Sequence, residues 1–166
     1  LSLSNFQGAN LSEVNLSYAK LSGAKLNHAT FRRTNLRWAD LSGASLYESE
    51  LRQVSLSGAK LVEADLRGAN LRWADLSGAN LAGADLSGAK LSGSNLTGAN
   101  LTGANLTDAS LVHADLSHAR LIDAAWGGAD LSGATLTGAK LAGVSRFGLR
   151  AEGVTCAWVD LSGSGD

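Results

Sequence analysis

Leucine occupies 27 of the 33 positions that lie five residues apart, in one unbroken phase, from Leu1 to Leu161. Alanine usually stands two residues before each leucine and glycine two residues after it, as in the stretch ADLSGANLAGADLSGAKL over residues 74–91. The positions between them are mostly Ser, Thr, Asn, Asp, Lys and Arg. Apolar and polar positions therefore recur within blocks of five residues.

A period of five fits neither regular secondary structure. On an α-helix, five residues advance by about 500°, so successive leucines would spread around the axis. On a straight strand, successive leucines would point to opposite faces. The pattern instead predicts a chain that turns a corner in every block, so that each Leu and the Ala before it point inward. Glycine then lies at the corner, where it tolerates an unusual φ.

A repeat this regular excludes a conventional globular core and predicts a solenoid of stacked coils. The block A-(D/N)-L-x-x, seen in residues 74–78 and 104–108, resembles the pentapeptide-repeat family. That resemblance implies an all-β fold, a right-handed quadrilateral β-helix with four blocks per coil and about eight coils. We expect a single β-helix domain over residues 1–166, with no helix over residues 6–140.

The fill of the repeat changes near the end of the chain. Residues 1–141 keep regular coils, whereas in residues 142–166 the leucine positions hold Arg146, Ala151 and Cys156. We expect Arg146 to turn outward, because an unpaired buried charge is costly, and Cys156 to face inward. This irregular segment should cap the rod or, alternatively, form a homodimer contact through the coil end. The residues proposed for either role are Phe147, Leu149 and Trp158.

One part of the predicted surface is rich in arginine and tryptophan. Residues 20 apart would stack on one face, so three arginines with that spacing would form consecutive rungs about 4.8 Å apart. One interpretation is a solvated face whose charges pair with Glu13, Glu48 and Glu50. The other is a binding patch, because Arg and Trp are enriched at interface hot spots. The candidate partner-binding residues are Arg32, Arg33, Arg37, Trp38, Arg52, Arg72 and Trp73.

The chain carries no catalytic motif, and its glycines follow the repeat rather than a phosphate-binding loop. His113 and His118, with Asp115 between them, come nearest to a metal set, but successive blocks place them at different corners. We therefore expect no enzyme activity, no catalytic residue, no metal and no cofactor.

Composition narrows the choice of partners. There are 14 basic and 15 acidic residues, for a net charge of −1, so a nucleic-acid partner is not expected. No apolar run approaches the roughly 18–20 residues of a membrane span, so no membrane partner is expected either. The single cysteine favours a cytoplasmic location. The chain has no Met, so we expect Leu1 not to be the natural first residue.

These observations favour a non-catalytic interaction or scaffold module that displays rigid, flat faces to a protein partner and takes no small-molecule substrate. The alternative comes from the resemblance: some pentapeptide-repeat proteins imitate duplex DNA and protect a type II topoisomerase, gyrase, from inhibitors. Those proteins are strongly acidic dimers. Here residues 1–80 carry nine basic and seven acidic side chains, and residues 81–166 carry five and eight, which makes only a weak acidic field.

Overall fold

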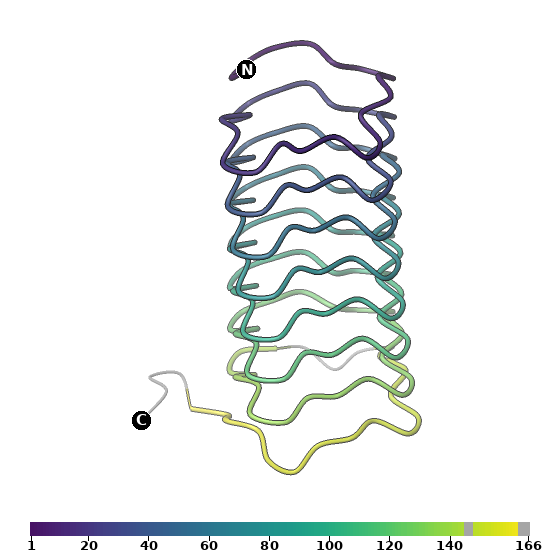
Figure 1. Ribbon diagram of the computed structural model, residues 1–166. Coiled ribbons are helices and arrows are strands. Elements are labelled where there is room, and N and C mark those ends of the chain that lie inside the picture. The colour runs from purple at the N-terminus through teal and green to yellow at the C-terminus, as the bar shows by residue number, and fades with distance from the viewer. Residues whose placement is uncertain (145–147, 163–166) are drawn as a thin grey trace.

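The structure, a computed structural model, describes residues 1–144 and 148–162. The chain winds into a rod of stacked coils, with the first described coil at one end and the last described coil at the other (Figure 1). The described ranges contain no helix and no strand longer than one residue. Single-residue parallel bridges join residues 20 apart, from Asn5↔Lys25 to Lys140↔Asp160. Each coil therefore comprises four blocks of five residues, as expected, with the same position of the repeat stacked in every coil.

Backbone hydrogen bonds explain how the coils stack without long strands. The Leu76 N–H donates to the Asn95 carbonyl at 2.7 Å, and the Gly78 N–H donates to the Thr97 carbonyl at 2.9 Å, both one coil further on. Within the block, the Ala79 N–H donates to the Leu76 carbonyl at 3.0 Å and closes the turn. Repetition of this set along the rod satisfies the polar groups of the backbone.

The corners of the coil lie in the left-handed region of the backbone. Every fifth residue from Leu3 to Gly153 has a positive φ, between 51° and 74°. Glycine occupies 17 of these corners, as expected, but 14 are occupied by other residues, among them Trp38 and Trp73. A residue with a Cβ costs about 1 kcal/mol more than glycine in this conformation. The fold therefore requires a positive φ at each corner, whichever residue occupies it.

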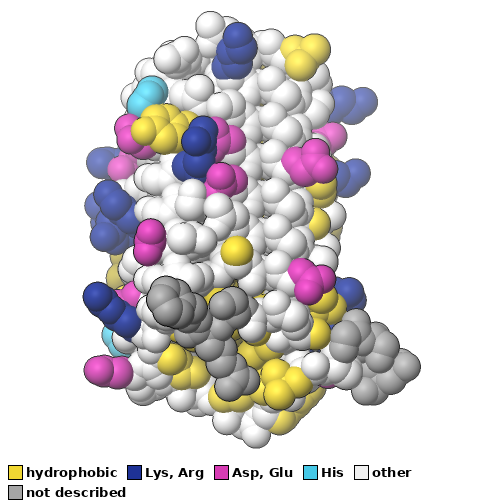
Figure 2. Space-filling model, turned by 180° about the vertical axis from the view of Figure 1, so that it is seen from behind, with side chains coloured by type: hydrophobic (Ala, Val, Ile, Leu, Met, Phe, Trp, Pro, Cys, Tyr) yellow, Lys and Arg dark blue, Asp and Glu magenta, His cyan; other side chains and the backbone are white. Residues whose placement is uncertain are grey.

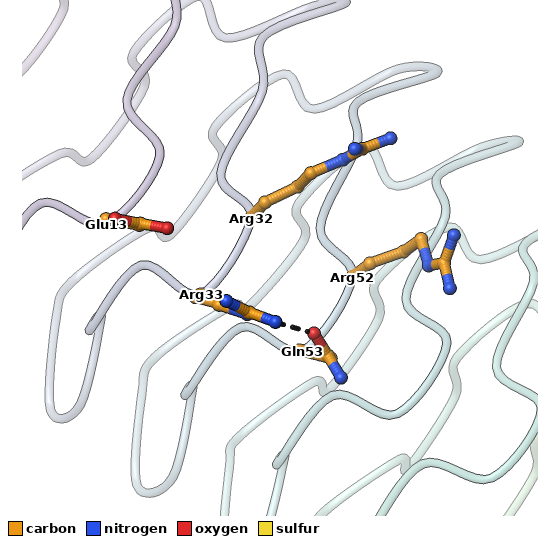
Figure 3. A pocket seen from close by; sticks show the side chains of 5 residues that line it. All are labelled: Glu13, Arg32, Arg33, Arg52 and Gln53. Atoms are coloured by element: carbon orange, nitrogen blue, oxygen red, sulfur yellow. Dashed lines mark hydrogen bonds between the residues drawn. The ribbon is translucent and has the colours of Figure 1, made fainter.

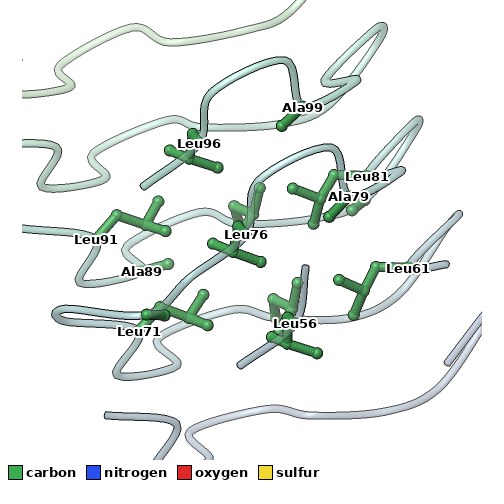
Figure 4. Close-up of a cluster of buried hydrophobic side chains, with 14 of the residues drawn as sticks. Leu56, Leu61, Leu71, Leu76, Ala79, Leu81, Ala89, Leu91, Leu96 and Ala99 are labelled. Carbon is green, nitrogen blue, oxygen red and sulfur yellow. The ribbon is translucent and has the colours of Figure 1, made fainter. Parts of the chain in front are cut away.

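The leucines and alanines of the repeat fill the interior, as expected. Figure 4 shows Leu56, Leu76 and Leu96 stacked inside successive coils, and all three are buried. Phe31 and Trp126 stand at leucine positions and are also buried, so the coil accommodates two larger side chains. Burial of the central side chains on every coil supplies the main favourable term in the stability of the rod.

Two serines at alanine positions bury a hydroxyl that lacks a hydrogen-bond partner, Ser49 Oγ and Ser94 Oγ. Thr34, at an equivalent position, donates instead to the Leu11 carbonyl at 2.6 Å. We expect Ser94→Ala and Ser49→Ala each to raise the free energy of unfolding by about 1 kcal/mol, because an unsatisfied buried hydroxyl is removed. The control Thr34→Val should lower it. Denaturant unfolding measures all three, and a loss of stability in both serine variants would contradict the assignment.

The Asn or Asp that precedes many of the leucines has a structural role that the sequence interpretation missed. Its side-chain oxygen accepts a hydrogen bond from the backbone N–H two residues later, as Asp75 does from Ser77 and Asn105 from Thr107, both at 3.1 Å. This local turn favours Asn and Asp because their side chains have the right length. The D/N position of the repeat thus stabilises the chain as it approaches the corner.

Some of these aspartates have a pKa that folding lowers. The Ser42 and Ser132 hydroxyls and N–H groups hold the pKa of Asp40 and of Asp130 below the ordinary value of 3.8. A pKa lowered by folding contributes stability above about pH 4, and that stability is lost as the pH falls through the folded-state pKa.

We therefore expect the melting temperature to drop below about pH 4. In the double variant Asp40→Asn, Asp130→Asn, the side chains keep their accepting oxygens but do not titrate. Its melting temperature should therefore fall less steeply at low pH than that of the wild type. Asp123→Asn, at a corner without this turn, is the control. Thermal melts from pH 7 to pH 2.5 measure the effect, and parallel acid limbs for all three proteins would refute it.

The last coil is less regular, as expected. The Gly138 N–H donates at 2.7 Å to the carbonyl of Trp158, one residue beyond the position that the register predicts. The Ala157 N–H donates to Thr137 Oγ1 at 3.2 Å. The expectation that Cys156 faces inward is wrong: the turn that follows leucine positions elsewhere is missing here, and Cys156 is exposed.

The residues proposed for the cap have different surroundings. Leu149 packs against the core, whereas Trp158 is 56% exposed and meets the ring of His118 edge to face, with 6.3 Å between centroids. Arg146 and Phe147 lie outside the described residues. Figure 2 shows hydrophobic side chains gathered toward this end of the rod. Capping and self-association both stay predictions.

Within the described ranges, no helix has the length and apolar character needed to cross a membrane.

Candidate functional site

The predicted arginine ladder is present on one side of the rod. Bridges Thr30↔Glu50 and Glu50↔Asn70 place three successive coils in register. Arg32, Arg52 and Arg72 each stand two residues after these bridge positions, so they form consecutive rungs of one face, which we call the arginine face (residues 29–33, 49–53 and 69–73). Arg32 and Arg52 are exposed, and Arg72 is half-buried.

A hollow of about 370 Å³ opens beside this ladder. It is lined by Glu13, Arg32, Arg33, Arg52 and Gln53 (Figure 3). Arg32 and Arg52 leave neighbouring coils in the same direction, while Arg33 and Gln53 come from the corner next to them. Arg33 Nε donates to Gln53 Oε1 at 3.3 Å, which fixes the corner side of the hollow.

The two candidate tryptophans lie at different corners. Trp73 occupies the corner of the arginine face, in line with Arg33. Trp38 follows Arg37 and lies at the far corner of the next face. Each ring packs over a glycine of the following coil, since a Cβ at Gly58 would collide with Trp38 and one at Gly93 with Trp73. The rings remain 54% and 60% exposed, so each has one side on the rod and one side open to solvent.

We call the seven candidate residues the Arg/Trp surface. The structure brings Arg32, Arg33 and Arg52 together around the hollow, with Arg72 and Trp73 on the following coil of the same face. It places Arg37 and Trp38 on the neighbouring face. The surface therefore extends around one edge of the rod.

The acidic partners expected for these arginines are mostly absent. Arg32 Nε lies 4.0 Å from Glu50 Oε1, but both Glu50 oxygens also accept from Asn70 Nδ2, at 3.1 and 3.0 Å. Glu48 is not a partner: it accepts from the Tyr47 hydroxyl at 2.6 Å on another face. Glu13 lines the hollow and forms no ion pair with any described residue.

Three arginines of the Arg/Trp surface differ from Arg32, which lies near Glu50. No ion pair among the described residues includes Arg37, Arg52 or Arg72. No side-chain hydrogen bond of these three is formed within the same residues either. Their guanidinium groups are available to an external acceptor.

In another charged cluster on the rod, an arginine is paired with an acidic residue of the protein itself. Arg67 binds Asp65 through two hydrogen bonds of 2.8 Å, and its guanidinium lies 5.4 Å from the centre of the Tyr47 ring. The Arg67 hydrogen bond holds the pKa of Asp65 below its ordinary value. Sequence reasoning missed this cluster, although the Asp-x-Arg spacing within one block could have indicated it. Its charges are satisfied within the protein.

The two histidines considered as metal ligands lie at separate corners of one coil. The rings of His113 and His118 each lie over a glycine of the next coil, Gly133 and Gly138. In the part of the chain that the structure describes, no three His, Cys, Asp or Glu side chains lie close enough together to hold a metal ion.

Comparison with known proteins agrees with the fold. A family model for pentapeptide repeats matches eight copies over residues 1–33, 34–72, 69–108 and 109–145. Among curated proteins, no sequence matches this chain. The structure of trypsin-treated QnrB1, a plasmid-mediated fluoroquinolone resistance protein, is 20% identical, covers 94% of this chain and 86% of its own, and has a TM-score of 0.61.

Two other solved structures have a higher sequence identity to this chain than QnrB1 has, but lower TM-scores. HetL, a pentapeptide repeat protein involved in heterocyst differentiation regulation in the cyanobacterium Nostoc sp. strain PCC 7120, is 32% identical over 92% of this chain and 87% of its own, with a TM-score of 0.49. A pentapeptide repeat protein of the Arabidopsis thaliana thylakoid lumen is 32% identical over 72% and 69%, with a TM-score of 0.47. The match of the family model over most of the chain shows that this protein belongs to the pentapeptide-repeat family, whose fold is a right-handed quadrilateral β-helix.

Proposed function

We propose that the chain is a non-catalytic protein-interaction module whose Arg/Trp surface binds an acidic region of a protein partner. The observation that carries the proposal is that, within residues 1–144 and 148–162, the guanidinium groups of Arg37, Arg52 and Arg72 form no ion pair. In the same coils, Arg67 is fully paired with Asp65. A rod that pairs some of its own charges, yet leaves Arg52 and Arg72 on one face and Arg37 on the next without an ion pair among the described residues, favours an external acidic partner.

The rigidity of the rod supports the same function. Neighbouring coils are held by backbone hydrogen bonds at every block, so the surface loses little backbone entropy on binding. Trp38 and Trp73 already pack one side of their rings against glycines. Their open sides offer apolar area that short Ser and Thr side chains cannot supply.

Imitation of DNA is the alternative function, and the charge pattern does not favour it. A DNA-like surface needs negative charge repeated along a face. Among residues 1–144 and 148–162, Asp65 and Asp85 are the one pair of acidic residues on consecutive rungs of the same ladder. QnrB1 is 20% identical to this chain. That level of similarity supports a shared fold but not a shared activity.

A pull-down from a lysate of the source organism tests the proposal. The wild type is compared with the double variant Arg52→Glu, Trp73→Ala and with Arg120→Glu, an exposed site on the opposite face. The double variant should lose the partner, and Arg120→Glu should retain it. All three should melt within a few degrees of one another, because the changed side chains are exposed. Recovery of the same proteins in equal yield by all three would reject the proposed function.

A further inference from the structure

We propose that the Arg/Trp surface receives an acidic α-helix that lies along the axis of the rod, with one carboxylate per helical turn over each of Arg32, Arg52 and Arg72. This inference rests on the proposed function and specifies the structure of the bound segment.

The spacing of the ladder carries the argument. Neighbouring coils lie about 4.8 Å apart, so three rungs span about 10 Å. On an α-helix, residues i, i+4 and i+7 face one side with about 5.4 Å per turn and span about 10.5 Å. On an extended peptide, side chains of one face are about 6.8 Å apart and three of them span about 14 Å. A helix therefore keeps its carboxylates over all three arginines. On an extended chain, the third carboxylate lies beyond the third arginine.

The edge beside the ladder provides a second, independent observation. Its corner residues on four successive coils are Glu13, Arg33, Gln53 and Trp73, all with positive φ and none of them glycine. In the described part of the rod, no other edge carries more than two non-glycine corners in succession. These side chains form a raised margin parallel to the ladder.

The margin and the ladder together define a linear site. The hollow lies between them, with Glu13, Arg33 and Gln53 on the corner side and Arg32 and Arg52 on the face. A straight segment placed along the rod would contact the guanidinium groups on one side and the corner residues on the other. Trp73 lies on the last coil of the site, where its open ring face can meet an apolar side chain of the helix.

Binding of designed peptides to the full chain tests the inference by fluorescence anisotropy. The first peptide is an alanine-rich helix with three glutamates at i, i+4 and i+7 and a fluorescein label. The second has the same composition with glutamates at i, i+5 and i+10, which point to different sides of the helix. The third is the first peptide with a central proline that prevents the helix. The first should bind most tightly. Arg52→Glu should weaken it by roughly ten-fold or more, and Arg120→Glu should leave it unchanged.

The outcomes separate this inference from the proposed function. Equal affinity for the first two peptides, or no binding of the first, would overturn the helical inference. A lysate partner that is still lost in the double variant would then continue to support the proposed function. Tighter binding of a labelled DNA duplex than of the first peptide, abolished by Arg52→Glu, would also overturn the inference, because the ladder would then recognise phosphates.

Discussion

Replacing Leu76 by alanine is expected to lower the free energy of unfolding by about 2–5 kcal/mol. Leu76 is completely buried and is stacked between Leu56 and Leu96. The neighbouring coils are fixed by short backbone hydrogen bonds, so they cannot collapse into the space left by the lost methyl groups. The cost therefore combines lost burial with an empty cavity.

Leu3→Ala is the matched control, because the same substitution is made at a leucine that is 80% exposed. It should change stability by less than about 0.5 kcal/mol. Guanidinium unfolding followed by far-ultraviolet circular dichroism measures both variants. Equal losses at the two positions would mean that the stacked leucines are not the main source of stability.

Gly58→Ala is expected to destabilise the protein by about 2 kcal/mol, against about 1 kcal/mol for Gly78→Ala. Both glycines occupy the same edge of the rod, with φ values of 66° and 61°. An added Cβ meets nothing within 4 Å at Gly78, but at Gly58 it collides with the Trp38 ring. Gly58→Ala should therefore also push Trp38 into solvent and shift its fluorescence to longer wavelength.

A double-mutant cycle isolates the contribution of the ring. In a Trp38→Ala background, the two glycine substitutions should cost the same, because only the backbone conformation then matters. If Gly58→Ala and Gly78→Ala are already equivalent in the wild-type background, the ring does not pack on Gly58.

The period of the sequence is enough to predict the interior of the rod. Leucines such as Leu76 and alanines such as Ala79 recur every five residues, and only a chain that turns can bury side chains with that spacing. The structure buries both residues. The number of sides could not be derived in the same way, because a period of five specifies a corner and not how many corners close a coil. The 20-residue register came from the resemblance to a known family, and the parallel bridges confirm it.

The pairing state of the arginines could not be predicted from the sequence. Arg52 and Arg67 each follow an acidic residue by two positions, Glu50 and Asp65. The shorter Asp65 holds Arg67 within its own block. The longer Glu50 reaches along the rod to Asn70, which leaves Arg52 free. The two acidic side chains differ by one methylene group, and only the shorter one pairs with the arginine two residues after it.

The orientation of Cys156 was mispredicted for a different reason. The five-residue frame continues through Cys156, but an irregular bend replaces the turn that should follow it. The Gly138 N–H therefore donates to the carbonyl of Trp158, where the regular register would place the carbonyl of Ala157. A frame in the sequence shows where a residue would point in a regular coil. It does not show where the coil stops being regular.

Site-specific photo-crosslinking tests the central claim, that the Arg/Trp surface binds the partner, most directly. A photoreactive phenylalanine analogue is placed at Gln53, on the margin of the hollow, or at Ala82, on the opposite face of the rod. Irradiation in a lysate of the source organism should give a partner adduct from position 53 and none from position 82. An adduct from position 82 alone, or equal adducts from both, would contradict the claim.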